Sequence, residues 1–124
     1  MKGIILLAHG SRDPQWTAPF EQVRMAVDRR LRQQATTLAY LEHSKPDFAT
    51  AVEQLVARGV TRIEVVPMFL GPGGHVRNDV PQLVERALAR HSQVRFFVKA
   101  YIGDVQAVID AIADYAASDD APVS

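Results

Sequence analysis

The chain alternates between short apolar runs and longer stretches in which apolar residues recur every three to four positions. Residues 3–8 form an uninterrupted apolar run, which is typical of a strand covered on both faces. Three further runs have the length and composition of strands and span residues 36–41, 62–69 and 94–98. Pro67 near the end of the third strand predicts that strand pairing fades there.

The stretches between these runs carry the spacing of amphipathic helices. Phe20, Val23, Val27 and Leu31 share one side of a helix, with charged residues between them. The same spacing recurs at Phe48, Val52, Leu55 and Val56, at Val80, Leu83, Val84, Ala87 and Leu88, and at Val105, Val108, Ile109 and Ile112. The expected N-terminal caps of these last three helices are Ser44, Asn78 or Asp79, and Asp104.

This alternation of strands and helices predicts an α/β fold, with a four-stranded parallel sheet between helices on both faces. Right-handed crossovers limit the topology, and we expect a three-layer, flavodoxin-like arrangement with strand order 2-1-3-4. No linker interrupts the pattern, so residues 1–117 are expected to form one domain, followed by a frayed tail at 118–124. Ligands of such sheets bind at the carboxyl ends of the strands.

Composition narrows the chemistry that this fold can carry out. The 124 residues include 14 Lys and Arg against 14 Asp and Glu, and this zero net charge does not favour nucleic-acid binding. There is no cysteine, which excludes disulfides, thiolate metal ligands and a cysteine nucleophile. No apolar segment approaches the ~20 residues of a membrane span, and we expect a cytoplasmic protein.

Four residues with metal-binding or proton-accepting side chains follow the predicted strands. His9 ends the first strand, Glu42 and His43 follow the second, and His75 lies in the loop after the third. Neighbouring strands lie ~4.8 Å apart, so the order 2-1-3-4 places Glu42, His9 and His75 along one edge of the sheet. Imidazole and carboxylate groups suit a divalent first-row metal ion, and imidazoles also accept protons near neutral pH.

The loop after the third strand is suited to a broad, flat ligand. Three glycines leave the backbone beside His75 without side chains, namely Gly71, Gly73 and Gly74. Three cations occupy loops at the same edge, namely Arg12, Lys45 and Arg77. Together they predict a locally positive mouth for a substrate that carries several carboxylates.

Each of these residues also has a purely structural interpretation. A single histidine after a strand is often a loop or cap residue, and a glycine-rich loop can be a tight connection. Glu42 is equally a solvated residue or a partner for Lys45, and His43 is expected to be a surface residue. The occurrence of both His9 and His75 at adjacent strand ends is what favours a functional site.

Other catalytic classes lose support at the same positions. Ser11 is not surrounded by a Gly-x-Ser-x-Gly nucleophile motif, and we expect it to cap the first turn after the first strand. His9-Gly10 matches part of the Arg-His-Gly sequence of histidine phosphatases, but Ala8 stands in place of the arginine. Residues 10–12 do not match the dinucleotide-binding sequence G-x-G-x-x-G. His91 is expected to interact with the last carbonyls of the third helix.

Two segments resemble the signatures of the CbiX/SirB family of sirohydrochlorin chelatases. LLAHGSRDP at 6–14 is similar to the N-terminal signature, and VPMFL at 66–70 with GGHVRNDVP at 73–81 is similar to the second. Leu41-Glu42 ahead of Pro46, and Ile102-Gly103 ahead of the last helix, also fit. The resemblance runs from about residue 3 to about residue 115.

The resemblance implies a short, single-domain class II chelatase, equivalent to one half of the two-domain enzymes. Such enzymes insert a divalent metal, as substrate, into a sirohydrochlorin-type tetrapyrrole without ATP or an organic cofactor. Co²⁺ is expected first, with Fe²⁺ and Ni²⁺ as alternatives, in cobalamin or sirohaem biosynthesis. Because most relatives contain two such domains with the substrate between them, the resemblance also implies a homodimer.

The resemblance further assigns roles to individual residues. His9 and His75 would be the catalytic and metal-binding histidines, with Glu42 as the acidic metal ligand. The substrate-binding residues would be Ser11, Arg12, Lys45, Leu70, Gly71, Gly73, Gly74 and Arg77. Two alternatives stay open, namely a non-catalytic carrier of metal or tetrapyrrole, and a small-molecule hydrolase or phosphatase that uses the same edge. Neither a nucleic acid nor a membrane is an expected partner.

Overall fold

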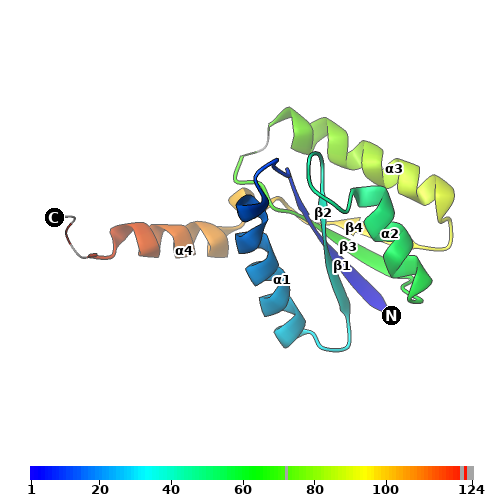
Figure 1. The fold of residues 1–124 in the computed structure, drawn as a ribbon, viewed down its shortest axis with the longest axis horizontal. Coiled ribbons are helices and arrows are strands. Elements are labelled where there is room, and N and C mark those ends of the chain that lie inside the picture. The colour runs from blue at the N-terminus through cyan, green and yellow to red at the C-terminus, as the bar shows by residue number, and fades with distance from the viewer. Residues whose placement is uncertain (72, 121, 123–124) are drawn as a thin grey trace.

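The computed structural model describes residues 1–71, 73–120 and 122, with only the backbone at positions 75 and 76. Four strands form one parallel sheet in the order β2-β1-β3-β4, which confirms the predicted topology (Figure 1). The strands are β1 (Lys2–Ala8), β2 (Ala35–Tyr40), β3 (Arg62–Pro67) and β4 (Arg95–Val98). β3 ends at Pro67, which has no N–H to continue the ladder.

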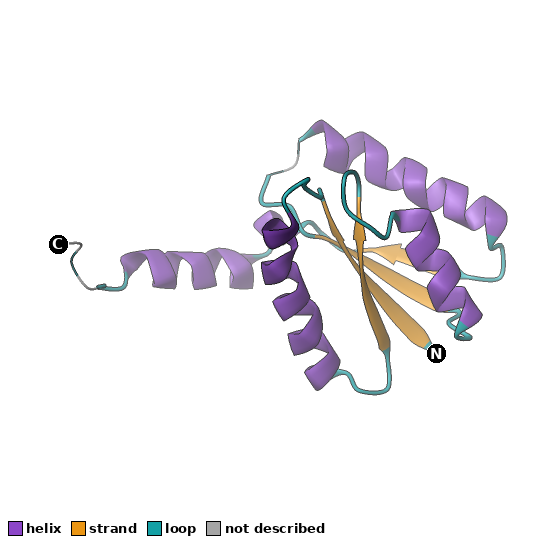
Figure 2. Cartoon of the chain, viewed as in Figure 1, coloured by secondary structure: helices purple, strands orange, loops and turns teal. Residues whose placement is uncertain are grey.

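Helices cover the two faces of the sheet unequally. The longer helices are α1 (Ala18–Arg30), α2 (Phe48–Ala57), α3 (Val80–Arg90) and α4 (Gln106–Ala117). Two short 3-10 helices, η1 (Pro14–Thr17) and η3 (Ile102–Asp104), precede α1 and α4. One face is covered by α1 alone, and the other by α2 and α3 (Figure 2). No helix among the described residues is long and apolar enough to cross a membrane.

Alternate side chains of β1 belong to two separate apolar clusters. Ile4 and Leu6 point to the α1 side, whereas Ile5 and Leu7, both fully buried, face α2 and α3. Because both faces of β1 are buried, successive residues must be apolar, which explains the continuous apolar run in the sequence. Full burial of each large aliphatic side chain stabilises the fold by roughly 1.5–3 kcal/mol, so β1 is the energetic centre of the sheet.

Two predicted helix caps are wrong. The cap of α2 is Asp47, whose carboxylate accepts a hydrogen bond of 2.8 Å from the backbone N–H of Thr50, and not Ser44. Asp104 lies within η3, and Val105 occupies the cap position of α4. Asp79 does occupy the cap position of α3, as one of the two residues expected there.

The second half of the predicted glycine loop is helical. Residues His75–Asp79 form η2, a single turn of π-helix that leads directly into α3. π-turns of this kind are uncommon and occur frequently at functional sites. Among the described residues, the predicted loop therefore shrinks to 68–71 and 73.

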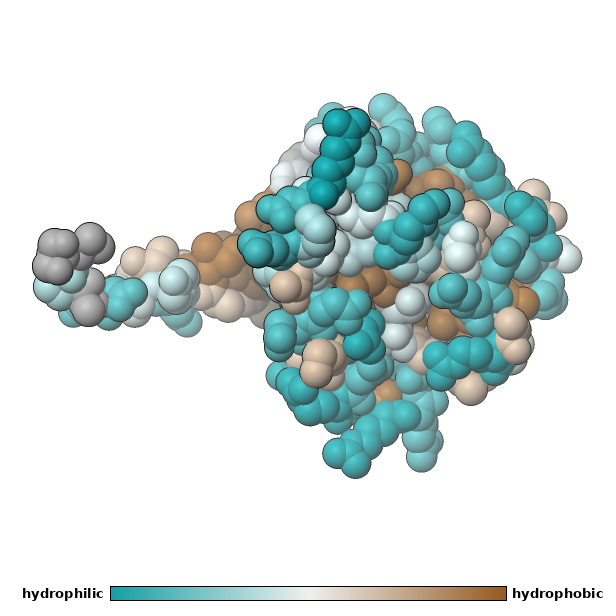
Figure 3. Space-filling view, viewed as in Figure 1, coloured by the Kyte–Doolittle hydropathy of each residue, from teal (hydrophilic) through white to brown (hydrophobic). Residues whose placement is uncertain are grey.

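The last helix departs from the expectation that helices pack on both faces of the sheet. α4 extends away from the body of the molecule (Figure 1). Its apolar residues are visible along the extension (Figure 3), and Ile109 and Ile112 are 43% and 47% exposed. Of the predicted tail at 118–124, positions 121, 123 and 124 lie outside the described residues.

Candidate functional site

His9 lies at the carboxyl edge of the sheet, directly after β1. Since β1 runs between β2 and β3, His9 occupies the middle of this edge, where the strand order reverses. Its side chain is exposed, and its ring packs against the ring of Phe69 with centroids 4.4 Å apart. Phe69 itself is buried, so it supports the imidazole from below while leaving it accessible to a ligand.

The backbone around His9 is held against the loop that follows β2. The N–H of Glu42 donates to the carbonyl of His9 at 2.9 Å, and the N–H of Leu41 donates to the carbonyl of Ala8 at 3.0 Å. Gly10 adopts a φ of 96°, and a Cβ there would lie 1.7 Å from the carbonyl oxygen of Glu42. Glycine is therefore required at position 10 by conformation and by contact.

Ser44 fixes the same two loops through its hydroxyl group. The backbone N–H of Ser11 donates to Ser44 Oγ at 3.0 Å, and Ser44 Oγ donates to the carbonyl of Ser11 at 3.0 Å. Ser11 Oγ accepts from the N–H of Asp13, and Asp13 in turn caps η1 by accepting from the N–H of Gln15. The expected capping role of Ser11 is therefore taken by Asp13.

Arg12, His43 and Glu42 form a connected polar group above these loops. The Nε of Arg12 donates to His43 Nδ1 at 3.4 Å, and His43 Nε2 lies 3.8 Å from a carboxylate oxygen of Glu42. The backbone of His43 adopts a φ of 66°, in the left-handed region. The partner of Glu42 in this structure is thus His43, while the charge of Lys45 acts on Asp47.

The loop after β3 is open, in contrast to the hydrogen-bonded loops beside His9. Leu70 is 65% exposed, and a Cβ built at Gly71, Gly73 or Gly74 would meet no atom within 4 Å. Arg77 is exposed on η2, with its N–H directed to the carbonyl of Gly73. This side of the edge therefore offers open space next to exposed apolar and cationic side chains.

The expected pairing of His9 with His75 stays a prediction. The backbone of His75 begins η2, after the strand that neighbours β1, but its side chain lies outside the described residues. Among the side chains that are described, no group of three or more His, Cys, Asp and Glu is arranged to hold a metal ion. The described part of the edge thus contributes His9 and Glu42, from adjacent strand ends.

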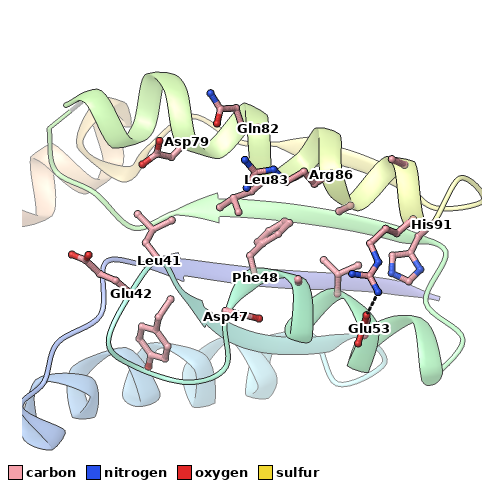
Figure 4. Close-up of a pocket in the computed structure, with 16 residues that line it drawn as sticks. Leu41, Glu42, Asp47, Phe48, Glu53, Asp79, Gln82, Leu83, Arg86 and His91 are labelled. Atoms are coloured by element: carbon pink, nitrogen blue, oxygen red, sulfur yellow. Dashed lines mark hydrogen bonds and ion pairs between the residues drawn. The ribbon is translucent and has the colours of Figure 1, made fainter.

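A groove between α2 and α3 was not expected from the sequence. It encloses about 790 Å³ over the apolar side chains of Leu41, Phe48 and Leu83 (Figure 4). One end reaches Glu42 at the carboxyl edge, and an ion pair of 3.0 Å between Arg90 and Glu53 crosses near the other end. The groove therefore opens toward the candidate site without including His9.

Sequence patterns did not identify Ser44 or Phe69 as parts of the site. The partner of Ser44 lies 33 positions away in the chain, and only the parallel pairing of β1 with β2 brings the two serines together. The buried ring of Phe69 supports His9, and no pattern along the chain indicates this contact. A serine that follows Glu42-His43 carries no local signal for such a role.

The fold and this edge define a class of small α/β proteins with a ligand site at the carboxyl ends of a parallel sheet. The CbiX family model matches residues 3–118, and the chain belongs to the CbiX family. A sirohydrochlorin cobaltochelatase of Saccharolobus islandicus is 31% identical over 84 residues, which cover 68% of this chain and 64% of that protein. The present chain thus aligns with less than two thirds of the length of this relative.

Solved structures with more than 25% sequence identity to this chain share its fold. The structure described as a putative cobalamin biosynthesis CbiX protein from Marinobacter aquaeolei has a TM-score of 0.82 and 36% identity, covering 94% of both chains. The sirohydrochlorin chelatase SirB of Bacillus subtilis in complex with cobalt has a TM-score of 0.81 and 26% identity. That comparison covers 91% of this chain but 48% of SirB, so this chain corresponds to about half of the longer protein.

Proposed function

We propose that this chain is a chelatase that inserts a divalent metal ion into a sirohydrochlorin-type tetrapyrrole without ATP. Co²⁺ is the first candidate, with Fe²⁺ and Ni²⁺ as alternatives, in cobalamin or sirohaem biosynthesis in the cytoplasm. The observation that carries the proposal is the exposed, supported imidazole of His9 at the carboxyl edge of the central strand, in a chain of the CbiX family. The names of its relatives support the same reaction.

In this proposal His9 and His75 hold the incoming ion through ring nitrogens, and Glu42 supplies a carboxylate from the neighbouring strand end. Three donors leave coordination positions open, so the ion remains exchangeable. Two protons leave the pyrrole nitrogens for each divalent ion inserted. One histidine accepts the first proton as the ion moves across, and the second passes to water.

The macrocycle binds on the open side of the edge. Gly71, Gly73 and Gly74 admit its flat face, and the exposed Leu70 contacts its apolar ring edge. The carboxylates of the substrate bind to the cations Arg12, Lys45 and Arg77. Near His9, the backbone of Ser11 also contacts the substrate. The exposure of all three cations is the support for this arrangement.

We also propose that residues 1–117 act as one domain and that two copies of the chain form the working enzyme. The support is the alignment of this chain with 48% of SirB, so that two copies would correspond to the two halves of the longer protein. A single domain presents one carboxyl edge, so a macrocycle bound there has water on its other side. A second domain opposite this edge encloses the macrocycle and strengthens its charged contacts.

The experiment that tests the function is anaerobic visible spectroscopy of the full chain with sirohydrochlorin and Co²⁺, Fe²⁺ or Ni²⁺ in turn. We expect spectral conversion faster than the rate without protein, over many turnovers. His9→Ala and His75→Ala should each lower the insertion rate by about 100-fold, the usual scale for losing a general base. His91→Ala is the matched control, because His91 lies at the end of α3 and should leave the rate unchanged.

A second candidate is a carrier that binds metal or tetrapyrrole without turnover. A carrier would use the same exposed imidazole of His9 at the carboxyl edge, because binding an ion needs the ligand but not the proton transfer. A carrier gives a spectral change that stops at one equivalent per site. Continued conversion beyond that point rejects the carrier, and a change that stops there rejects the enzyme.

A further inference from the structure

α4 is an amphipathic helix whose apolar side is exposed. Val105, Val108, Ile109, Ile112 and Tyr115 recur at helical spacing, and Tyr115 is 77% exposed. Within the described part of the chain, the helix has its substantial contacts only with η3, the turn just before it. Isolated helices shorter than ~12–15 residues are marginal in water, so this 12-residue helix requires a packing surface.

A surface of matching width lies on the α1 side of the sheet, over β3 and β4. A helix about 10 Å wide covers roughly two strands spaced ~4.8 Å apart, and α1 packs over β1 and β2. The remaining part of this face consists of Glu64, Val66, Met68 and Phe97, which we name the β3–β4 face. All four residues are only partly buried, so the face is partly open to solvent.

The β3–β4 face is surrounded by cations. The guanidinium groups of Arg62 and Arg95 lie 4.0 and 5.4 Å from the ring centre of Phe97. The Nζ of Lys2 lies 2.8 Å from a carboxylate oxygen of Glu64, and this hydrogen bond lowers the pKa of the Glu64 carboxyl. The positive charge of Lys99 lowers the same pKa further. Lys2, Arg62 and Lys99 thus act on the Glu64 carboxylate, and Arg95 adds a fourth cation beside Phe97.

The segment that contains α4 carries the opposite charge. Residues 102–124 include five Asp and no Lys or Arg, whereas residues 1–101 include 14 Lys and Arg against nine Asp and Glu. Attraction between such regions directs their approach and favours pairing of unlike surfaces. Asp110 and Asp114 lie opposite the apolar side of α4, so they stay in water when that side is covered.

The base of α4 is fixed in a way that keeps the helix off its own sheet. The N–H of Gly103 donates to the carbonyl of Phe69 at 3.0 Å, and a Cβ at Gly103 would lie 1.7 Å from the carbonyl oxygen of Leu70. The N–H of Asp104 donates to the carbonyl of Tyr101 at 2.9 Å, which closes η3. From this tightly packed junction α4 leads away from the sheet (Figure 1).

We propose that α4 packs its apolar side on the β3–β4 face of a second copy of this chain, and that the exchange is reciprocal. The inference rests on the homodimer in the proposed function and names the surfaces that form it. Phe69 links the two sites, because its carbonyl holds the base of α4 and its ring supports His9. The partner therefore lies beside the carboxyl edge, where it completes the enclosure of the macrocycle.

The test uses cross-linking between full-length chains, which is specific because the chain has no cysteine. A chain carrying Val66→Cys and a tagged chain carrying Ile112→Cys are mixed and treated with a short bis-maleimide. We expect a product that contains one chain of each kind. Asp110→Cys, on the opposite side of α4, replaces Ile112→Cys in the matched control and should reduce the yield at least tenfold.

Three results would overturn the exchange. Ile112→Cys linked to itself, in the absence of Val66→Cys, would indicate pairing of two α4 helices. A link within one chain that carries both cysteines, with none between chains, would place α4 on its own sheet. Absence of any link, together with the 13.7 kDa mass of one chain in sedimentation, would show that α4 has no partner copy.

A second measurement separates this inference from the proposed function. The double variant Ile109→Asp/Ile112→Asp should sediment as one chain, while the wild type sediments as two, because the new charges prevent α4 from packing on an apolar surface. Both side chains are exposed in the single chain, so the variant should still fold. An exchanged dimer without insertion activity would refute the chelatase and leave the exchange standing. A wild-type monomer with full insertion activity would refute the exchange and leave the chelatase standing.

Discussion

Two loops at the same edge of the sheet are built in opposite ways. The loop at residues 9–13 is held by hydrogen bonds to the loop at residues 41–46, and Gly10 contacts the backbone of Glu42. The glycines after β3 have empty space where a Cβ would stand. One loop therefore gives His9, the proposed metal ligand, a fixed position, and the other gives a large ligand room to approach. A chelatase needs both properties, because the ion must be presented in one place to a macrocycle that arrives from solution.

The largest effect is expected for Gly10→Ala, which tests whether the first loop is as tightly fixed as described. The methyl group would overlap the carbonyl oxygen of Glu42 at 1.7 Å, in a backbone conformation with a φ of 96°. We expect a loss of about 3 kcal/mol in the free energy of unfolding, measured by urea denaturation. Gly71→Ala is the matched control, and equal losses in both variants would remove the contrast between the loops.

A smaller loss is expected for Ser44→Ala. The variant removes both hydrogen bonds to the backbone of Ser11 and leaves its N–H without this partner. Removing two such bonds should cost about 1–2 kcal/mol in thermal or urea unfolding. Ser92→Ala, at an exposed position, should cost less than about 0.5 kcal/mol, and a similar loss there would show that Ser44 has no special role.

Asp47 follows the loop at residues 41–46, and its carboxyl group makes the stability of the protein depend on pH. The hydrogen bond from the Thr50 N–H lowers the pKa of the Asp47 carboxyl. A carboxyl whose pKa is lowered by folding stabilises the protein above its ordinary pKa, and this contribution disappears as the pH falls through the lowered value. Asp47→Ala should therefore cost about 1 kcal/mol at neutral pH, the usual value of a lost cap.

The pH dependence gives this prediction its control. The difference in unfolding free energy between wild type and Asp47→Ala should narrow as the pH falls below about 4, where the carboxyl becomes protonated. Asp47→Asn keeps a capping oxygen without the titration, so its stability should vary less with pH than that of the wild type. A difference that stays constant across the acid range would contradict the assigned role of the carboxylate.

The smallest effect on stability is expected for Gly74→Ala. A methyl group at this position meets no atom within 4 Å, so the free energy of unfolding should change by less than about 0.5 kcal/mol. The same methyl group stands where the macrocycle is proposed to lie, so the KM for sirohydrochlorin should rise while kcat changes little. An unchanged KM would remove Gly74 from the substrate site and restrict the open side to the remaining glycines.

The sequence was a reliable guide wherever a pattern is local. The apolar run before His9 predicted β1, and the alternation of strands and helices predicted the strand order. Local signals competed at the start of α2, where Ser44 and Asp47 are both good caps, and the helix begins after the second of them. Ser44 instead bonds to Ser11, a contact between loops that no spacing within either loop could indicate.

Long-range placement accounts for the other differences. The spacing from Val108 to Ile112 predicted a helix correctly, but periodicity shows only that one side is apolar and not which surface covers it. The wide π-turn of His75–Asp79 also lacks a sequence signature that distinguishes it from a loop. The candidate site was predictable as a set of residues at strand ends, whereas its support by Phe69 required the folded chain.

The hydrogen bonds that join the two loops beside His9 also predict how the region exchanges its amide hydrogens with solvent. The amides of Ser11, Leu41 and Glu42 each donate across the boundary between the loops, and the amide of Tyr40 donates to the carbonyl of Pro46. Opening of the boundary exposes the first three amides together, so these should exchange deuterium as one cooperative unit. The imidazole of His9 then keeps its position for as long as that unit stays closed, so deuterium uptake by these neighbouring amides reports how long the geometry proposed for metal binding persists.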